Sequence, residues 1–326
     1  MAAVATMPAG SSPRWIVNRG VDLWLIIGSA LAGYLYLGLY TAAHVKISLL
    51  WWFWSVGFDG THIFATASRT YFDAEARTRD RRLLFGSLAV FFSIGPLMVL
   101  AGQKGLLALL VGVWAYYHVI RQHYGFMVLY KVKNGDLEKR DQVLDRMFLG
   151  VMMIFPPFHR FFVHHPEELG IKLAVPAAEP YLWVFVAGVS AVWAARQIGR
   201  WRRNLPKYLL LGAIIPLHWL TFAYMSWQAA VPTVTIVHNL QYHALVWFHN
   251  RNRYAGRTVL SRSLGAYVAA ALLFSALYRI PGFQLGQVSD LAFGFFCGFG
   301  LTHYYLDSRI WRVRHDPGLR EALQMA

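Results

Sequence analysis

Long apolar segments separated by short basic ones constrain the fold of this chain more than any other feature. A helix needs about 20 mostly apolar residues to cross a bilayer. Only 14% of the residues are charged, against about 25% in a typical soluble domain. The sequence therefore predicts an all-α, polytopic membrane helix bundle of about ten transmembrane helices. The ten segments are 21–43, 47–67, 83–102, 105–130, 145–163, 180–195, 208–227, 229–249, 264–280 and 287–306.

The fifth segment is the least regular of the ten. It carries Arg146 at one end and the pair Pro156 and Pro157 near the other. Proline removes a backbone donor and clashes with the preceding helical turn. We therefore expect the helix to break at these prolines.

The basic residues predict an orientation. If the N-terminus is cytoplasmic, 25 of the 31 Lys and Arg residues fall in cytoplasmic segments, five fall on the opposite side, and Arg121 lies inside a helix. This bias follows the positive-inside rule, and it accounts for the net charge of +15 without a nucleic-acid partner. We expect both ends inside, with cytoplasmic tails 1–20 and 307–326 around a transmembrane domain 21–306. The expected location is a bacterial inner (cytoplasmic) membrane.

Histidines are concentrated in four of the apolar segments, all of which run inward in this topology. An ionisable group inside a membrane indicates a functional site by default, and neutral imidazole is the commonest metal ligand. The single cysteine, Cys297, excludes an internal disulfide and a cysteine-based metal cage. The predicted metal ligands are His62, His118, His123, His238, His243 and His303.

The spacing of these histidines limits how they can share an ion. His118 and His123, like His238 and His243, are five residues apart, which puts them about 140° apart around an α-helix. A π-bulge would bring each pair into line. Otherwise the two members of a pair serve different metals or different sides of one cluster. His249, further along the same segment, is expected to be interfacial or to support the ligands.

Two acidic residues and one arginine accompany the histidines. Asp59 precedes His62 by three residues and Asp307 follows His303 by four, so each shares a helical face with its histidine. Either carboxylate would ligate a metal or orient an imidazole, or form a helix-end salt bridge. Arg121 needs an anionic partner or a water-filled path. We predict catalytic roles for Asp307, Asp59 and Arg121.

Other histidines are expected to be structural. His218 stands alone on its segment and is interpreted as an interhelical hydrogen-bond partner. Five more lie in or near loops, and no chemistry is expected from them: His44, His159, His164, His165 and His315. The glycines of segment 287–306 would either leave room for a substrate or pack helices together.

The histidine-bearing segments resemble those of the integral-membrane non-haem iron oxygenases. They are most similar to the Brp/Blh-type β-carotene dioxygenases, with fatty-acid desaturases and hydroxylases as the second choice, since the H-x2-H-H boxes of desaturases are absent. The resemblance rests on "DGTH" at 59–62, "YYHVIRQHYGF" at 116–126, "HNLQYHALVWF" at 238–248 and "THYYLDSRIWR" at 302–312. It implies non-haem iron, dioxygen as co-substrate and an elongated lipid-soluble substrate.

The leading hypothesis is a membrane-embedded iron-dependent oxygenase that cleaves, hydroxylates or desaturates a carotenoid or an acyl chain. One or two iron ions would be bound. The expected partners are the lipid-soluble substrate, membrane lipids and a redox partner, with no nucleic acid. Two alternatives stay open at this point: a transporter of metal ions or protons, and a membrane protein that binds haem through two histidines.

Overall fold

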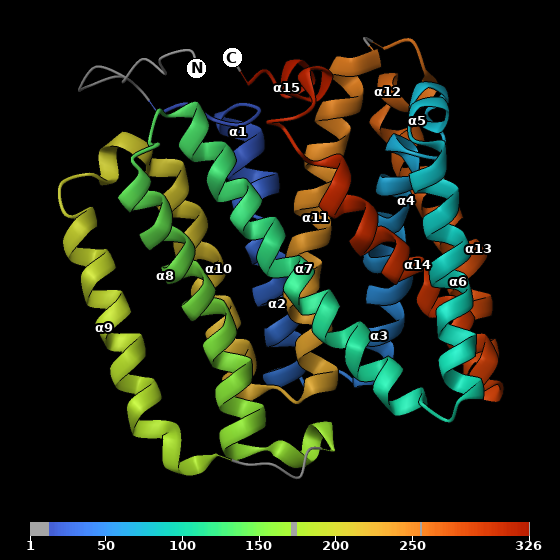
Figure 1. Ribbon diagram of the computed structural model, residues 1–326, viewed down its shortest axis with the longest axis horizontal. Helices are drawn as coiled ribbons and strands as arrows, with labels where there is room; N and C mark the ends of the chain where they lie inside the picture. The colour runs from blue at the N-terminus through green and yellow to red at the C-terminus, as the bar shows by residue number, and fades with distance from the viewer. Residues whose placement is uncertain (1–12, 171–174, 255, 326) are drawn as a thin grey trace. The chain divides into compact units, whose positions relative to one another are not determined.

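The computed structural model describes residues 13–170, 175–254 and 256–325, and all their regular secondary structure is helical (Figure 1). The chain divides into two compact units, which are described separately. The first comprises Met1–Ile47 and Val119–His238, and the second comprises Ser48–His118 and Asn239–Ala326. Residues 1–12 of the predicted N-terminal tail lie outside the described residues. Two long helices, α7 (Lys104–Lys133) and α11 (Trp227–Tyr254), each contribute one part to each unit.

Within the described residues, six helical stretches are long and apolar enough to cross a membrane, which indicates an integral membrane protein. They are Arg19–Thr41, Arg81–Leu100, Lys139–His164, Pro176–Gln197, Trp201–Tyr224 and Leu264–Val288. The other four predicted segments, 47–67, 105–130, 229–249 and 287–306, are also helical. These four are the segments that carry the predicted histidine ligands. Ten crossings, and the orientation of the chain, stay predictions.

In the first unit, a layered set of long helices forms the framework. Helix α8 packs against α9 and α10, and α10 packs against α2. Shorter helical turns connect these elements. The bounds are α1 Arg19–Val21, η1 Asp22–Ile27, α2 Ala30–Thr41, α8 Lys139–Phe158, η3 His159–His164, η4 Pro166–Leu169, η5 Pro176–Ala178, α9 Glu179–Gln197, η6 Trp201–Asn204 and α10 Leu205–Tyr224.

The expected break at the two prolines does not occur. Helix α8 continues through Pro156 and Pro157 and passes directly into η3, a π-helical turn. Pro156 has no N–H to donate to the carbonyl of Met152 four residues earlier. The indole Nε1 of Trp219 donates to that carbonyl instead, at 2.9 Å. A side chain from α10 therefore satisfies the backbone group that the proline leaves exposed, as membrane helices require.

Buried charges of the first unit balance one another. Lys131 and Lys207 are both buried. Lys207 Nζ lies 3.1 Å from Asp136 Oδ2 and 3.2 Å from Asp145 Oδ2, and Lys131 also pairs with both carboxylates. Two cations therefore face two anions, which offsets much of the cost of removing these charges from water.

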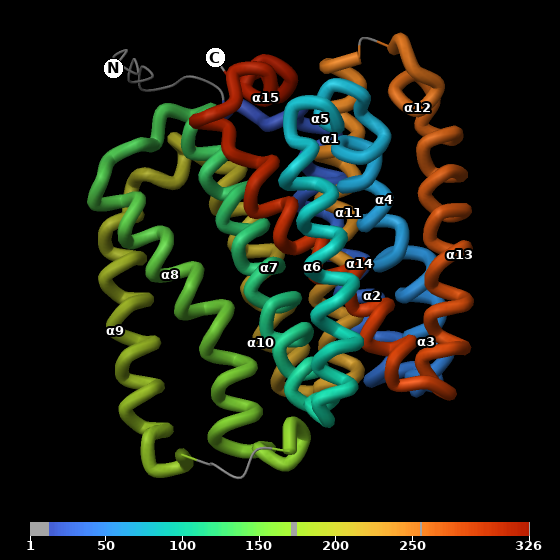
Figure 2. Tube along the Cα trace, turned by 45° about the vertical axis from the view of Figure 1, so that its right-hand side comes forward, coloured from blue at the N-terminus to red at the C-terminus, as the bar shows by residue number. Residues whose placement is uncertain are grey.

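The second unit is built mainly from α4, α6, α13 and α14. In Figure 2, α13 runs beside α4 and α14 beside α6, and residue contacts join both pairs. Helix α4 continues α3 through the π-helical turn η2. The bounds are α3 Ile47–Trp54, η2 Ser55–Asp59, α4 Gly60–Arg69, α5 Ala74–Arg79, α6 Arg81–Leu100, α12 Val259–Arg262, α13 Leu264–Val288, α14 Asp290–Ile310 and α15 Pro317–Ala322.

Glycines allow α6 and α14 to approach closely. A Cβ on Gly95 would lie 2.0 Å from the carbonyl oxygen of Gly294, and one on Gly298 would lie 3.0 Å from the carbonyl oxygen of Phe91. Small residues of this kind let membrane helices bring their backbones together. Of the two interpretations of these glycines, helix packing therefore holds for Gly294 and Gly298.

The turn η2 changes the register of the helix just before His62. Side-chain hydroxyls donate to two backbone carbonyls of this turn. Thr61 donates to the carbonyl of Phe58 at 2.8 Å, and Ser275 of α13 donates to the carbonyl of Val56 at 2.6 Å. π-Helical turns of this type are frequent at functional sites. The turn therefore fixes the orientation of α4, the helix that carries His62.

Candidate metal centre

Three helices of the second unit bring a buried group of histidines and one carboxylate together. His62 lies on α4, His118 on α7, and both His303 and Asp307 on α14. All four side chains are buried. His118, His303 and Asp307 place ligand atoms within 4.8 Å of one another, a separation that a single metal ion can bridge. The structure thus brings together four of the predicted site residues.

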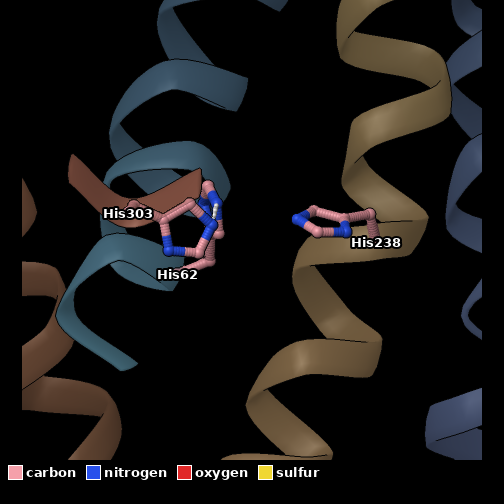
Figure 3. Close-up of side chains that lie close together, drawn as sticks. All are labelled: His62, His238 and His303. Carbon is pink, nitrogen blue, oxygen red and sulfur yellow. Dashed lines mark hydrogen bonds between the residues drawn. The ribbon is translucent and has the colours of Figure 1, made fainter. Parts of the chain in front are cut away.

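Distances within the group suit a metal ion. The Nε2 atoms of His62 and His303 are 2.9 Å apart (Figure 3), and His118 Nε2 is 3.6 Å from Asp307 Oδ2. Two ligands held at right angles about 2.1 Å from one ion would lie about 3.0 Å apart. These separations are compatible with ligands that share one metal ion.

Thr66, one helical turn after His62, links the two candidate ligands of α14, His303 and Asp307. Its hydroxyl lies 2.7 Å from His303 Nδ1 and 2.9 Å from Asp307 Oδ1. The hydroxyl has one proton, and the carboxylate is the stronger acceptor for it. His303 Nδ1 then carries a proton and donates it to Thr66, which leaves the Nε2 lone pair for a metal.

His62 is held in the same tautomer. Its Nδ1 lies 2.5 Å from the backbone carbonyl oxygen of Asp59. A carbonyl oxygen can only accept a hydrogen bond, so Nδ1 carries the proton. Its Nε2 then faces Nε2 of His303 at 2.9 Å, so an ion beside the two nitrogens could accept a lone pair from each ring. Histidines that bind a metal through one ring nitrogen usually donate the other ring N–H to an oxygen, as Nδ1 of His62 does here.

The carboxylate of Asp307 uses its two oxygens differently. Oδ1 accepts from the Tyr242 hydroxyl at 2.7 Å and from Thr66, whereas Oδ2 is the oxygen that faces His118. Tyr242 and Thr66 thus orient the carboxylate and leave one oxygen for an ion. Neither residue was among the predicted site residues, although Thr66 shares a helical face with His62 at a spacing of four.

The two other predicted catalytic residues lie in different surroundings. The Asp59 carboxylate forms an ion pair with Arg279 of α13, and its Oδ1 is 3.8 Å from His62 Nδ1. Asp59 therefore orients His62, chiefly through its backbone. Arg121 belongs to the first unit, where its exposed side chain stacks over Tyr124, with the guanidinium carbon 5.4 Å from the ring centre. A catalytic role for Arg121 stays a prediction.

Two further predicted ligands, His243 and His123, lie in other surroundings. His243 places Nε2 3.1 Å from the Thr61 hydroxyl and Nδ1 3.1 Å from the Tyr267 hydroxyl. His123 belongs to the first unit and lies edge-to-face with His218, with ring centres 5.8 Å apart. His218 is thus beside another histidine and not isolated.

His238 and His249 complete the histidines of α11. His238, also labelled in Figure 3, is buried and is the last residue of the first unit. It precedes Tyr242 by one turn of α11, on the same face, and its role as a ligand stays a prediction. His249 is buried with Nδ1 3.0 Å from Asn250 Oδ1, and its role as an interfacial or supporting residue stays a prediction.

The spacing of five residues is accommodated without a bulge. Helices α7 and α11 are α-helical through His118, His123, His238 and His243. The members of each pair therefore point to different surroundings, the second of the two possibilities that the spacing allowed. The π-helical turns occur elsewhere, at η1, η2 and η3.

An apolar cavity of about 200 Å³ reaches the histidine group. His303, Thr66 and Thr302 form its polar end, and the rest of its wall is hydrocarbon and aromatic. The other lining residues are Ile63, Ala67, Tyr71, Phe72, Leu88, Phe92, Phe274, Phe299 and Leu306. The cavity lies entirely within the second unit and offers space for a hydrophobic group beside His303.

No protein-family model, curated protein or solved structure matches this chain. The family suggested by the sequence motifs is therefore not identified by comparison. The sequence and the geometry establish a helical membrane protein with buried histidine and aspartate clusters that could hold a metal ion.

Proposed function

We propose that this protein is a membrane-embedded, metal-dependent oxygenase that acts on a lipid-soluble substrate and uses non-haem iron and dioxygen. The observation that carries the proposal is the buried set of two histidines and one carboxylate, His118, His303 and Asp307. A facial set of two histidines and one carboxylate with open positions is typical of non-haem iron oxygenases. The resemblance of the histidine-bearing segments to membrane iron oxygenases points to the same class.

The donor set favours iron or another transition metal over magnesium or calcium. Imidazole suits iron, zinc, copper and nickel, whereas magnesium and calcium prefer oxygen ligands. The set contains no thiolate, because its donors are two imidazoles and one carboxylate and do not include Cys297. The nearby His62 adds an imidazole beside His303, so the group has donors for one or two ions.

The cavity supports a hydrophobic substrate. Apart from its polar end, the wall offers methyl, methylene and aromatic groups, which bind a polyene or an acyl chain by burial of apolar surface. The part of a substrate that enters this cavity would lie against His303. Carotenoids and acyl chains both meet these requirements.

Each residue of the site has a distinct task in this proposal. Bound iron would supply the binding and activation of dioxygen. Thr66 and Tyr242 hold Asp307 in place, Thr66 fixes the proton on His303 Nδ1, and the Asp59 carbonyl fixes the proton on His62 Nδ1. The aromatic wall excludes water and orients the substrate.

Metal analysis of the purified full-length protein tests the proposal. We expect one or two iron ions per chain, no porphyrin absorption, and loss of iron in Asp307→Asn. Asp290→Asn is the matched control, because Asp290 lies on the same helix but at its exposed start, paired with Lys104. Incubation with labelled dioxygen and a lipophilic polyene or acyl substrate should transfer label to the product.

Three results would overturn the proposed function. A porphyrin spectrum would establish a haem protein. Metal uptake into liposomes without any oxygenation would establish a transporter. Product formation by a metal-free preparation would also contradict the role assigned to Asp307 and its histidine partners.

A further inference from the structure

We propose a second metal site, separate from the buried group, formed by His159, His164 and Glu179 in the first unit. It would bind a divalent ion of the zinc type. His159 and His164 are the first and last residues of η3, and Glu179 is the first residue of α9. In Figure 1 the end of α8 and the start of α9 lie at the same end of this unit.

The π-helical turn makes this pair a chelating one. His159 and His164 are five residues apart in the sequence "HRFFVH", and an α-helix would place them about 140° apart. In a π-helix the backbone hydrogen bonds join residues five apart, so such residues come into line. The two Nε2 atoms are accordingly 3.2 Å apart, with ring centres separated by 4.4 Å.

The carboxylate of Glu179 completes a compact triangle of donors. Its Oε1 lies 2.8 Å from His159 Nε2 and 3.3 Å from His164 Nε2. Ligands about 2.0 Å from a tetrahedral zinc ion are about 3.3 Å apart. The three edges of the triangle are therefore at or slightly below the separation that an ion would impose, so binding requires little rearrangement.

The surroundings orient the triangle and leave it accessible. Trp183, one turn into α9, places Nε1 3.4 Å from Glu179 Oε1, and its ring centre lies 5.4 Å from that of His159. The side chains of His159, His164 and Glu179 are 22%, 46% and 34% exposed. Water can therefore reach the fourth position, and the site can exchange metal with solvent, unlike the buried group.

A metal ion bound to His159, His164 and Glu179 would link η3, which follows α8, to the start of α9. The three ligands span the connection between these helices, which includes residues 165–178. Because the ion would bind only the folded arrangement, it would raise the free energy of unfolding at this end of the unit. The increase would grow with the logarithm of the ratio between the ion concentration and the dissociation constant.

Zinc binding to the full-length protein in detergent tests the proposal. Protein stripped with a chelator is dialysed against Zn²⁺, and bound zinc is counted in the wild type, His164→Ala and Glu179→Gln. We expect each variant to bind one zinc ion fewer than the wild type, or to bind it at least 10-fold more weakly, since even supporting partners of ligands cost 10–100-fold. Cobalt in place of zinc should give the intense visible absorption of a tetrahedral site.

His165→Ala is the matched control. His165 adjoins the site and pairs with Glu167 at 3.2 Å, so its removal should leave zinc binding unchanged. Asp307→Asn should likewise retain this zinc ion, which separates the result from the fate of the buried group. Equal zinc content in the wild type, His164→Ala and Glu179→Gln would overturn the proposal. It would show that the three residues form only a hydrogen-bonded cluster.

Discussion

The substitution Thr66→Val examines how the buried group is organised. Valine keeps the shape of threonine but removes the hydroxyl that contacts His303 Nδ1 at 2.7 Å, Asp307 Oδ1 at 2.9 Å and the Tyr242 hydroxyl at 2.7 Å. The N–H of His303 then has no acceptor at this position. Supporting partners of this kind are worth about 10–100-fold in metal affinity, which corresponds to about 1.4–2.7 kcal/mol.

The assay is competition for iron between the purified protein and a chelator of known affinity. Thr302→Val is the control, because Thr302 adjoins His303 and is buried, but its hydroxyl has no hydrogen-bond partner among the described residues. We expect Thr66→Val to release iron at about 10–100-fold lower chelator concentration than Thr302→Val. Equal retention by the two variants would refute the argument that Thr66 fixes the tautomer of His303.

Two further predictions concern stability. Burial raises the pKa of Asp73, but hydrogen bonds from the Tyr254 hydroxyl and from backbone N–H groups outweigh it and hold the pKa below its ordinary value. This contribution to stability is present above the pKa of the unfolded state, about 3.9, and is lost as the pH falls through the lower pKa of Asp73 in the folded protein. The stability of Asp73→Asn should therefore fall less at acid pH than the stability of the wild type. Gly95→Ala would force a methyl group into the backbone of Gly294 and should destabilise the protein by about 1–3 kcal/mol, measured by thermal unfolding. Gly86→Ala, with open space at its Cβ position, should have little effect, and a similar loss in both variants would contradict the close approach of α6 and α14.

Local periodicity made part of the site predictable. The spacing of four residues between His303 and Asp307 placed both on one face, and the structure puts His303 Nδ1 3.8 Å from Asp307 Oδ1. The spacing of three placed the Asp59 and His62 side chains on one face, and Asp59 Oδ1 lies 3.8 Å from His62 Nδ1. The closer contact, from the Asp59 backbone carbonyl at 2.5 Å, was not predicted. Such contacts are properties of a single helix and need no knowledge of how helices pack.

Contacts between helices could not be predicted in the same way. Nothing in the sequence shows that Thr66 and Tyr242 meet at Asp307, because that meeting depends on the packing of α4, α11 and α14. The continuation of α8 through Pro156 also depends on another helix, whose Trp219 satisfies the Met152 carbonyl. Proline weakens an isolated helix, but a neighbouring side chain can compensate for the lost hydrogen bond.

The helices that carry the candidate ligands are less apolar than the six stretches that are long and apolar enough to cross a membrane. The six most apolar stretches contain none of His62, His118 and His303, whereas α4, α7 and α14, which carry these residues, fall outside that set. A helix that supplies buried polar ligands must give up part of its hydrophobicity, and it can remain in a membrane only if those groups are satisfied internally. In the second unit the hydrogen bonds of Thr66, Tyr242 and the Asp59 carbonyl provide that satisfaction at His62, His303 and Asp307. These hydrogen bonds use Nδ1 of His62 and His303 and leave each Nε2 directed toward the other candidate ligands. The bonds that satisfy the polar side chains within a membrane therefore also organise the candidate metal centre.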